Sequence, residues 1–276
     1  MTEEARAFVP GHITGFFSAH PDDSDPTKAG STGAGLTLTD GVAVTVQQGN
    51  GPSLTLNGDA LEVEAVDRVL DALGAPAVVA AETELPLGAG FGVSGALALG
   101  TALAANHAYR RQLSENELVT IAHGADVQAG SGLGDVVAQA RGGVPIRLDP
   151  GGPQDNHLDG IPARARVEYL SMGELSTEDV LSGDTTLLSE AGKRALSRVV
   201  EEPTLASFVH ASRRFAREAE LLTPGVTEVI QDGLAADGQA SMAMLGETVF
   251  ALGTGLSDAG YDPSVCATHP AGAMLK

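Results

Sequence analysis

Residues 86–100, PLGAGFGVSGALALG, combine closely spaced glycines with the start of an apolar helix. Gly88, Gly90 and Gly92 stand at alternate positions, so the backbone there can bend close to a ligand without side-chain clashes. Ser94 then opens a helix rich in alanine and leucine, whose free N–H groups and positive dipole end suit a phosphate. No Gly-Lys-Ser/Thr follows, which excludes a Walker A loop, and the Rossmann spacing is imperfect. The segment predicts either a phosphate-binding loop or a tight structural turn.

Two aspartates and one cysteine are further residues whose side chains could take part in chemistry. Asp135 follows Gly134 directly before a predicted helix, a position in which an aspartate commonly caps the helix N-terminus. Asp126 lies on a helix predicted to begin at Ser114, and could be one solvated acid among 36. Cys266 is the single cysteine, which excludes an internal disulfide and a multi-cysteine metal site. No nearby His or Asn pattern supports a nucleophile, so we interpret it as an incidental thiol.

Short strands, turns and helices must position these residues in the first half of the chain. The predicted strands and turns are residues 7–17 as strand and turn, 35–49 as a hairpin turning at Asp40-Gly41, 53–61 with a turn at Asn57-Gly58, and the strand 77–85. The predicted helices are residues 63–73, residues 94–109 and a helix from Ser114, where Ser114 and Glu117 form a capping-box pattern.

The second half begins at a stretch rich in Gly, Pro and Asp, residues 149–162, which we interpret as a linker or long loop. A strand is predicted over residues 163–173, and two strands over residues 239–252 that meet at Gly246-Glu247. Helical patterns cover residues 186–200, 204–222 and 224–236. Because helices and strands mix in both halves, the sequence predicts an α+β protein.

The net negative charge of the chain argues against some classes of function. The 276 residues include 36 Asp and Glu against 16 Lys and Arg, and no tryptophan. A surface this negative repels phosphate backbones and anionic lipid, so we expect no nucleic-acid partner and no membrane partner. The acids are dispersed and lysines are few, a pattern that fits a halophilic protein. The uncharged residues 85–109 are broken by Pro86 and several glycines, and the opening residues lack an apolar core, so we expect a cytoplasmic protein.

Several segments, in the same order along the chain, resemble the signature motifs of GHMP kinases, which are ATP-dependent small-molecule kinases. Residues 86–95 resemble their phosphate loop, Pro-x-Gly-x-Gly-x-Gly-Ser-Ser-Ala. The matching residues are Pro86, Gly88, Gly90, Gly92 and Ser94, while Val93 replaces the first serine and Gly95 the alanine. Residues 130–144, GSGLGDVVAQARGGV, resemble the segment that places an aspartate before a helix and closes with Gly-Gly.

Two further regions, the third motif and the opening of the chain, narrow the resemblance to the archaeal pantoate kinases within this superfamily. Residues 241–246, SMAMLG, stand in the place of the third motif and are Met-rich, as in that family. Residues 7–20, AFVPGHITGFFSAH, and residues 25–35, DPTKAGSTGAG, resemble its opening. His12 stands where mevalonate and related kinases carry a lysine after Pro-Gly, which counts against mevalonate kinase itself.

The resemblance implies ATP and Mg²⁺ as cofactors and assigns roles to particular residues. The nucleotide would lie on Pro86, Gly88, Ala89, Gly90, Gly92, Val93 and Ser94. Ser94 and Asp126 would hold Mg²⁺, although relatives usually carry Glu where Asp126 stands, and an octahedral Mg²⁺ needs few protein ligands. Asp135 would accept the proton of the acceptor hydroxyl or orient that hydroxyl, so Asp135, Ser94 and Asp126 form the expected catalytic set.

The acceptor implied by the resemblance is pantoate, a small hydroxy acid that needs a local cation and hydrogen-bond donors. Arg147 is the candidate for the carboxylate, which arginine can bind bidentately. His123, three residues before Asp126 on the same helical face, could add a hydrogen bond. Ser31 and Thr177 are further candidates for substrate binding. A surface arginine, a satisfied helix histidine, a loop hydroxyl and a helix cap are the structural alternatives for the four residues.

As a family implication, the fold would be a GHMP kinase fold, with a ribosomal-protein-S5-like domain in residues 1–155 and a ferredoxin-like domain in residues 156–276. The resemblance also implies a homodimer that supplies 4-phosphopantoate for coenzyme A synthesis. Two alternatives stay open. One is a GHMP kinase for homoserine, mevalonate or shikimate, and the other is a catalytically silent member that binds a metabolite and regulates a partner.

Overall fold

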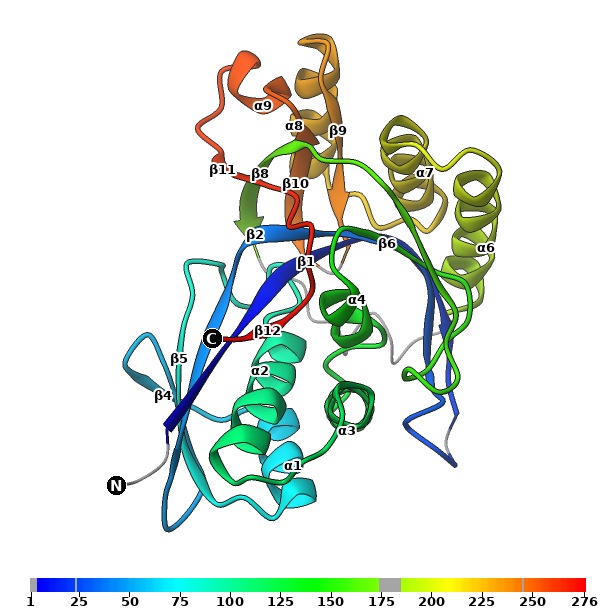
Figure 1. The fold of residues 1–276 in the computed structure, drawn as a ribbon. Helices are drawn as coiled ribbons and strands as arrows, with labels where there is room; N and C mark the ends of the chain where they lie inside the picture. Colours follow the sequence, from blue (N-terminus) through cyan, green and yellow to red (C-terminus); the bar gives the residue numbers. More distant parts are fainter. Residues whose placement is uncertain (1–3, 23, 174–184, 245) are drawn as a thin grey trace.

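The computed structural model describes residues 4–22, 24–173, 185–244 and 246–276, which form two sheets with helices packed against them (Figure 1). This arrangement confirms the predicted α+β class. The strands are β1 (Glu4–His20), β2 (Gly30–Gln48), β3 (Ser53–Leu56), β4 (Asp59–Leu61), β5 (Ala77–Glu82), β6 (Val144–Arg147), β7 (Leu158–Ile161), β8 (Arg166–Gly173), β9 (Gln239–Ala243), β10 (Glu247–Leu252), β11 (Ser264–Ala267) and β12 (Met274–Leu275). The helices are α1 (Glu64–Leu73), α2 (Val93–Ala108), α3 (Glu115–Gln128), α4 (Asp135–Arg141), α6 (Thr186–Glu201), α7 (Leu205–Glu218), α8 (Pro224–Ala235) and α9 (Gly255–Asp258).

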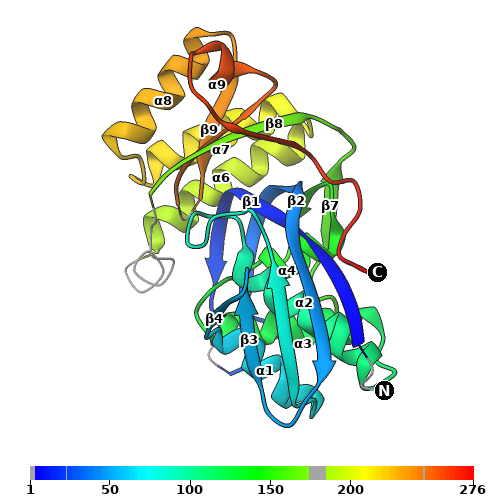
Figure 2. The ribbon, with the colours of Figure 1, turned by 90° about the vertical axis from the view of Figure 1, so that its left-hand side faces the viewer.

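The larger sheet has the order β12-β1-β2-β5-β3-β4, with β6 pairing to β2 and β7 to β6 (Figure 2). Most neighbours are antiparallel, and β3 and β5 are parallel. Strands β3 and β4 meet at Asn57-Gly58, where both residues have positive φ angles of 53° and 92°. That geometry suits a tight hairpin, and it confirms the predicted turn.

The predicted hairpin over residues 35–49 is wrong, because β2 runs unbroken through Asp40-Gly41. β2 pairs along almost its whole length with β1, and Gly41 lies opposite Pro10 beside a shift in register. A Cβ atom on Gly41 would lie 2.3 Å from the carbonyl oxygen of Val9. The glycine therefore permits close contact between two long strands, and an Asp-Gly pair does not demand a turn there.

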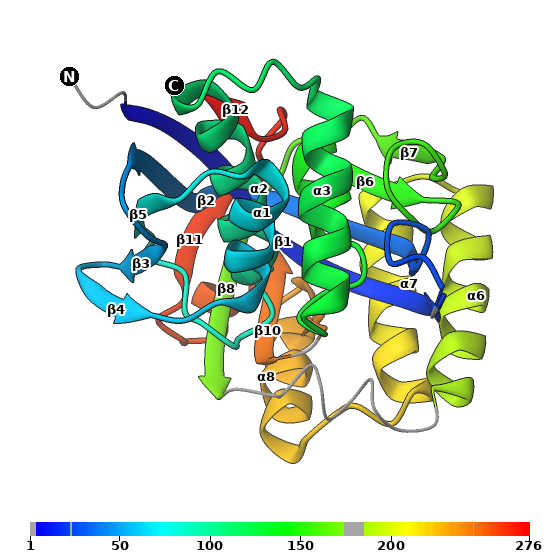
Figure 3. The same ribbon diagram turned by 90° about the horizontal axis from the view of Figure 1, so that it is seen from below.

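Helix α2 is the central element that carries the glycine-rich segment toward the core. Its buried face is broad and made mostly of alanine and leucine, because β1 and β2 pack on one side and α1 and α3 on the other (Figure 3). A Cβ atom on Gly100 would lie 2.6 Å from a methyl group of Val44, so glycine lets the helix approach the sheet closely. The capping box at Ser114 and Glu117 is present at the start of α3 and confirms that prediction.

The smaller sheet has the order β11-β8-β10-β9, and α7 lies between it and the far half of β1. Phenylalanines fill this junction: Phe208 of α7 contacts Phe16 and Phe250, and Phe215 contacts Phe16 and Phe17. All five are buried. Their apolar contacts bind the two sheets together, which fixes the position of β1 against the segment before β10.

Two segments beyond residue 155 pair within the larger sheet. Residues 149–162, expected as a loop, contain β7, which pairs with β6. At the end of the chain β12 pairs with β1, where Ala7 faces Leu275. The division into domains at residues 155 and 156 stays a prediction. Among the described helices, none is long and apolar enough to cross a membrane.

Candidate active site

The glycine-rich loop before α2 has the backbone that a phosphate site needs. Gly88, Gly90 and Gly92 have φ angles of 68°, 87° and 62°, a region that other residues enter only under strain. Gly92 is the N-cap of α2, and no side chain caps this helix end among the described residues. The first N–H groups of α2 are thus available to an anion, and the helix dipole favours one there. The loop therefore has the backbone geometry expected of a phosphate cradle.

Elements from both sheets hold this loop in place. The amide of His12 in β1 donates to the Phe91 carbonyl at 3.0 Å, and the Thr248 hydroxyl in β10 donates to the Ala89 carbonyl at 2.9 Å. A Cβ atom on Gly246 would lie 2.2 Å from the Ala89 oxygen, so only glycine permits this contact. The Met-rich segment singled out in the sequence therefore packs directly behind the phosphate loop.

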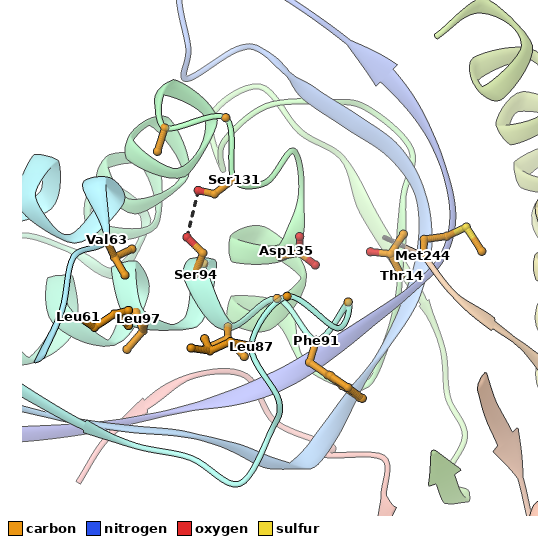
Figure 4. A pocket seen from close by; sticks show the side chains of 17 residues that line it. Thr14, Leu61, Val63, Leu87, Phe91, Ser94, Leu97, Ser131, Asp135 and Met244 are labelled. Carbon is orange, nitrogen blue, oxygen red and sulfur yellow. Dashed lines mark hydrogen bonds between the residues drawn. The ribbon is translucent and has the colours of Figure 1, made fainter. Parts of the chain in front are cut away.

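A cavity of about 350 Å³ opens over the loop. Figure 4 shows Leu61, Val63 and Leu97 at one end, Ser94 and Ser131 between, and Asp135, Thr14 and Met244 at the other end. One end is therefore apolar and the other carries hydroxyl and carboxylate oxygens. This division suits a nucleotide, with the base at the apolar end and the phosphates over the loop.

Ser94 and Asp126 meet beside the loop although they come from different helices. The Ser94 hydroxyl donates to Asp126 Oδ1 at 3.1 Å, and the Ser131 hydroxyl donates to the same oxygen at 2.7 Å. Asp126 is 1% exposed. Burial raises the pKa of Asp126 to about 7, and the charge of Asp135 adds to the rise, while the two serine hydroxyls oppose it. A buried carboxylate beside a serine hydroxyl has the oxygen donors of a metal ligand.

Asp135 is the first residue of α4 and is held by a buried histidine. Its Oδ1 lies 2.6 Å from Nδ1 of His12, and the side chains are 21% and 0% exposed. Burial acts to raise the pKa of Asp135, but the hydrogen bond and charge of His12 and the charge of Arg147 outweigh it and lower the pKa below its usual value. Burial lowers the pKa of His12. We therefore assign an ionised Asp135 that accepts a hydrogen bond from Nδ1 of His12.

A second, small cleft adjoins the cavity and contains Arg147. It is lined by Thr14, Phe17, Ser31, Leu133, Gly134, Asp135 and Arg147, and its enclosed volume is about 20 Å³. Arg147 is 1% exposed, its Nη2 donates to the Ser31 hydroxyl at 3.3 Å, and its Nη1 is buried without a partner among the described residues. An acceptor larger than water must widen the cleft or extend into the cavity. A carboxylate there would satisfy the unpaired guanidinium nitrogen.

Known proteins are similar to this chain in sequence and in fold. Residues 60–143 match the family described as "GHMP kinases N terminal domain". The pantoate kinase of Methanocaldococcus jannaschii is 34% identical over 252 residues, which cover 89% of this chain and 91% of the relative. The chain belongs to the pantoate kinase family. The pantoate kinase of Thermococcus kodakarensis is also 34% identical, over 264 residues that cover 90% of this chain and 87% of the relative.

Solved structures agree with membership of the pantoate kinase family. One described as "Phosphotransferase related to CoA biosynthesis pathway" has a TM-score of 0.88 at 29% identity and covers 99% of this chain and 98% of its own. One described as "MDDEF in complex with MVAPP, AMPPCP and Magnesium" has a TM-score of 0.74 at 16% identity. The match covers 100% of this chain and 99% of that chain, and it shows a common fold alone. The predictions of a GHMP kinase fold and of an ATP-dependent kinase are confirmed.

The structure brings most of the predicted site residues of this family member together. The large cavity is lined by Gly88, Gly90, Gly92, Val93, Ser94 and Asp135, and the small cleft by Asp135, Ser31 and Arg147. Pro86 and Ala89 shape the loop without lining the cavity. His123 is buried behind the cleft and donates from Nε2 to the Ala29 carbonyl at 2.8 Å. Thr177 lies outside the described residues.

Several residues of the site were not predicted from the sequence. His12 was noted only as a substitution, and Thr14, Ser131 and Met244 were not assigned a place. Ser131 stands in GSGLGD, where a hydroxyl between two glycines was a usable signal. His12 contacts Asp135 and Thr14 accepts a hydrogen bond from Met244, so both contacts join β1 to residues more than a hundred positions away, which no local pattern reveals.

Proposed function

We propose that this chain phosphorylates (R)-pantoate on its 4-hydroxyl with ATP, giving 4-phosphopantoate and ADP for coenzyme A synthesis. The observation that carries the proposal is the position of Asp135, which lines both the cavity over the phosphate loop and the cleft that contains Arg147. A carboxylate held between a site for a phosphate donor and a site for an anionic acceptor can serve phosphoryl transfer. The relatives named as pantoate kinases support this acceptor.

ATP would occupy the larger cavity. Its phosphates would lie over Gly88, Gly90 and Gly92, where positive φ angles leave backbone N–H groups free of side-chain cover. The N-terminus of α2 begins directly behind them and favours negative charge. The adenine would lie against the apolar residues at the other end of the cavity, near Leu61 and Val63.

Mg²⁺ fits the pair formed by Ser94 and Asp126. Both supply oxygen atoms, the ligands that Mg²⁺ prefers, and the buried carboxylate lacks a counter-charge among the described residues. Ser94 and Asp126 would hold the ion, which would supply positive charge beside the phosphates. In its absence Ser94 and Ser131 keep the Asp126 carboxylate in one orientation.

Asp135 would take the proton of the acceptor hydroxyl. Because its pKa is lowered, it is ionised at neutral pH and can accept that proton. His12 fixes its orientation by donating to Oδ1, which leaves Oδ2 for the substrate. Most of the rate enhancement of such transfers comes from positioning and charge stabilisation, so a moderately basic carboxylate is sufficient.

Arg147 and Ser31 would bind the carboxylate of pantoate. Nη1 of Arg147 is an unpaired donor and the Ser31 hydroxyl lies next to it. A Cβ atom on Gly134 would lie 2.7 Å from Nε of Arg147, so glycine lets the arginine lie against the start of α4. We assign His123 a supporting role, holding the backbone at Ala29 close to Ser31. Thr177 stays a predicted substrate contact.

The test is ADP release by the purified protein with MgATP in concentrated KCl, with pantoate, pantothenate, homoserine, mevalonate and shikimate offered separately. We expect release with pantoate alone. The Asp135→Asn variant should bind ATP normally and lose about 10²–10⁴-fold in kcat, the usual contribution of a base. Wild-type turnover by that variant would contradict the assigned role. Release with another acceptor would keep the kinase and reject pantoate, and ATP binding without any turnover would support a silent regulator.

We also propose a cytoplasmic homodimer adapted to concentrated salt, with neither nucleic acid nor membrane as partner. The salt adaptation is supported by the composition, in which 36 acidic residues outnumber 16 basic residues. At low salt these charges repel one another, and at high salt they are screened. Light scattering and thermal unfolding across a KCl series test both parts. A monomer at every concentration rejects the dimer, and greatest stability without KCl rejects the salt adaptation.

A further inference from the structure

The cavity over the phosphate loop and the cleft at Arg147 have two lining residues in common among the described residues: Asp135 and Thr14. A phosphoryl group that passes from a donor in the cavity to an acceptor in the cleft would pass beside these two shared side chains. Figure 4 shows both at the same end of the cavity, opposite the apolar end. Asp135 has a role in the proposed reaction, whereas Thr14 has none so far.

The backbone of Thr14 is fixed from two sides. Thr14 lies opposite Gly35 of β2, next to a shift in register, and its carbonyl accepts a hydrogen bond from the Met244 amide at 2.9 Å. The side chain is half-buried. A β-branched residue on a paired strand has restricted χ1 freedom, so the hydroxyl keeps a defined direction.

The Thr14 hydroxyl proton has no acceptor among the described residues. Its Oγ1 lies 3.5 Å from Nδ1 of His12. That nitrogen donates its own hydrogen to Asp135 at the shorter distance of 2.6 Å, so it cannot also accept one from Thr14. The hydroxyl is therefore free to donate to a ligand oxygen.

We infer that Thr14 is a substrate-contacting residue whose hydroxyl donates a hydrogen bond to an oxygen of the phosphoryl group in transit. This inference rests on the proposed phosphoryl transfer. No proton is transferred by Thr14: Asp135 takes the acceptor proton, and the hydroxyl stabilises charge on the phosphoryl oxygens. A fixed donor aimed at developing charge in a site shielded from water acts more strongly on the transition state than on the bound substrates.

Two substitutions separate this role from a packing role. Thr14→Val keeps the size and branching of the side chain but removes the donor. Thr14→Ser keeps the donor but removes a methyl group. If Thr14 acts as a donor, Thr14→Val should lower kcat by about 10²-fold with little change in KM for either substrate, and Thr14→Ser should stay within a few-fold of wild type. If Thr14 only packs, the order of the two variants reverses.

Thr45→Val is the matched control, because Thr45 is a half-buried threonine on β2 that lines neither cavity. It should leave kcat unchanged. Wild-type turnover with pantoate tests the proposed function, whereas the ratio of the Val and Ser variants tests Thr14. If wild type phosphorylates no acceptor, single-turnover hydrolysis of ATP gives the same comparison with water as acceptor. A Thr14→Val variant within about three-fold of wild type, or a Thr14→Ser variant as slow as Thr14→Val, would overturn the inference.

Discussion

Replacing Asp126 by Asn should make the metal-free protein more stable at alkaline pH. Asp126 is 1% exposed, and burial raises the pKa of its carboxyl from 3.8 to about 7. The unfolded chain therefore releases this proton at lower pH than the folded chain. Because the folded-state pKa is the higher one, the stability it contributes is fully present below about pH 4 and is lost as pH rises to about 7. Asparagine keeps an oxygen that accepts from Ser94 and Ser131 and cannot ionise.

The size of the effect follows from these two pKa values. The full difference corresponds to about 4 kcal/mol at 1.36 kcal/mol per pH unit. About 1.7 kcal/mol of it is already lost at pH 5, since the unfolded chain is ionised there. The advantage of Asp126→Asn over wild type should therefore be about 2–3 kcal/mol larger at pH 8 than at pH 5.

Urea unfolding followed by circular dichroism measures this difference, since the chain has no tryptophan to report by fluorescence. Wild type and Asp126→Asn should be compared at pH 5 and pH 8, with a metal chelator and constant KCl. Mg²⁺ added at pH 8 should stabilise wild type and not the variant, because a ligand stabilises the state that binds it. The variant should also lose kinase activity. Equal differences in unfolding free energy at the two pH values would refute the argument from burial.

Substitutions at three other residues test separate contacts. His12→Leu removes the donor that lowers the pKa of Asp135, so the acid limb of the kcat/KM profile should move to higher pH, whereas His12→Asn should keep most of the wild-type profile. Arg147→Lys should raise KM for pantoate about 10–100-fold without changing that for ATP, because lysine cannot bind a carboxylate bidentately. Gln139→Leu removes the donor to the Gly92 carbonyl and should weaken ATP binding about five-fold by calorimetry.

Elements with strong local patterns could be predicted from the sequence. The helix after the glycine loop, the capping box at Ser114 and the turn at Asn57-Gly58 depend on neighbouring residues and occur as expected. The turn predicted at Asp40-Gly41 does not form, because pairing of β2 with β1 overrides the local turn preference. Local patterns fail where a partner far along the chain decides the conformation.

The candidate site divides in the same way. Ser94, Asp126 and Asp135 could be proposed from family motifs, and the structure places Ser94 and Asp135 on one cavity, with Asp126 buried behind Ser94 and hydrogen-bonded to it. The contact between His12 and Asp135 joins residues 123 positions apart, so spacing alone could not predict it. Thr14 lies within residues 7–20, whose resemblance assigned it no role, and its position at two cavities depends on how β1, α4 and the residues after β9 pack together.

Two of the buried polar atoms without a partner among the described residues belong to side chains of the candidate site. Nε2 of His12 and Nη1 of Arg147 are buried without partners among the described residues. Each costs free energy that a better-paired site would not lose. The overall charge of −20 repels anionic substrates at long range. In molar salt, however, the Debye length falls to about 3 Å, so this repulsion acts only over short distances. Recognition of ATP and a small acid must therefore depend on contacts inside the site with Arg147, the N-terminus of α2 and the hydroxyl groups. Salt screens such contacts least, because they lie away from solvent.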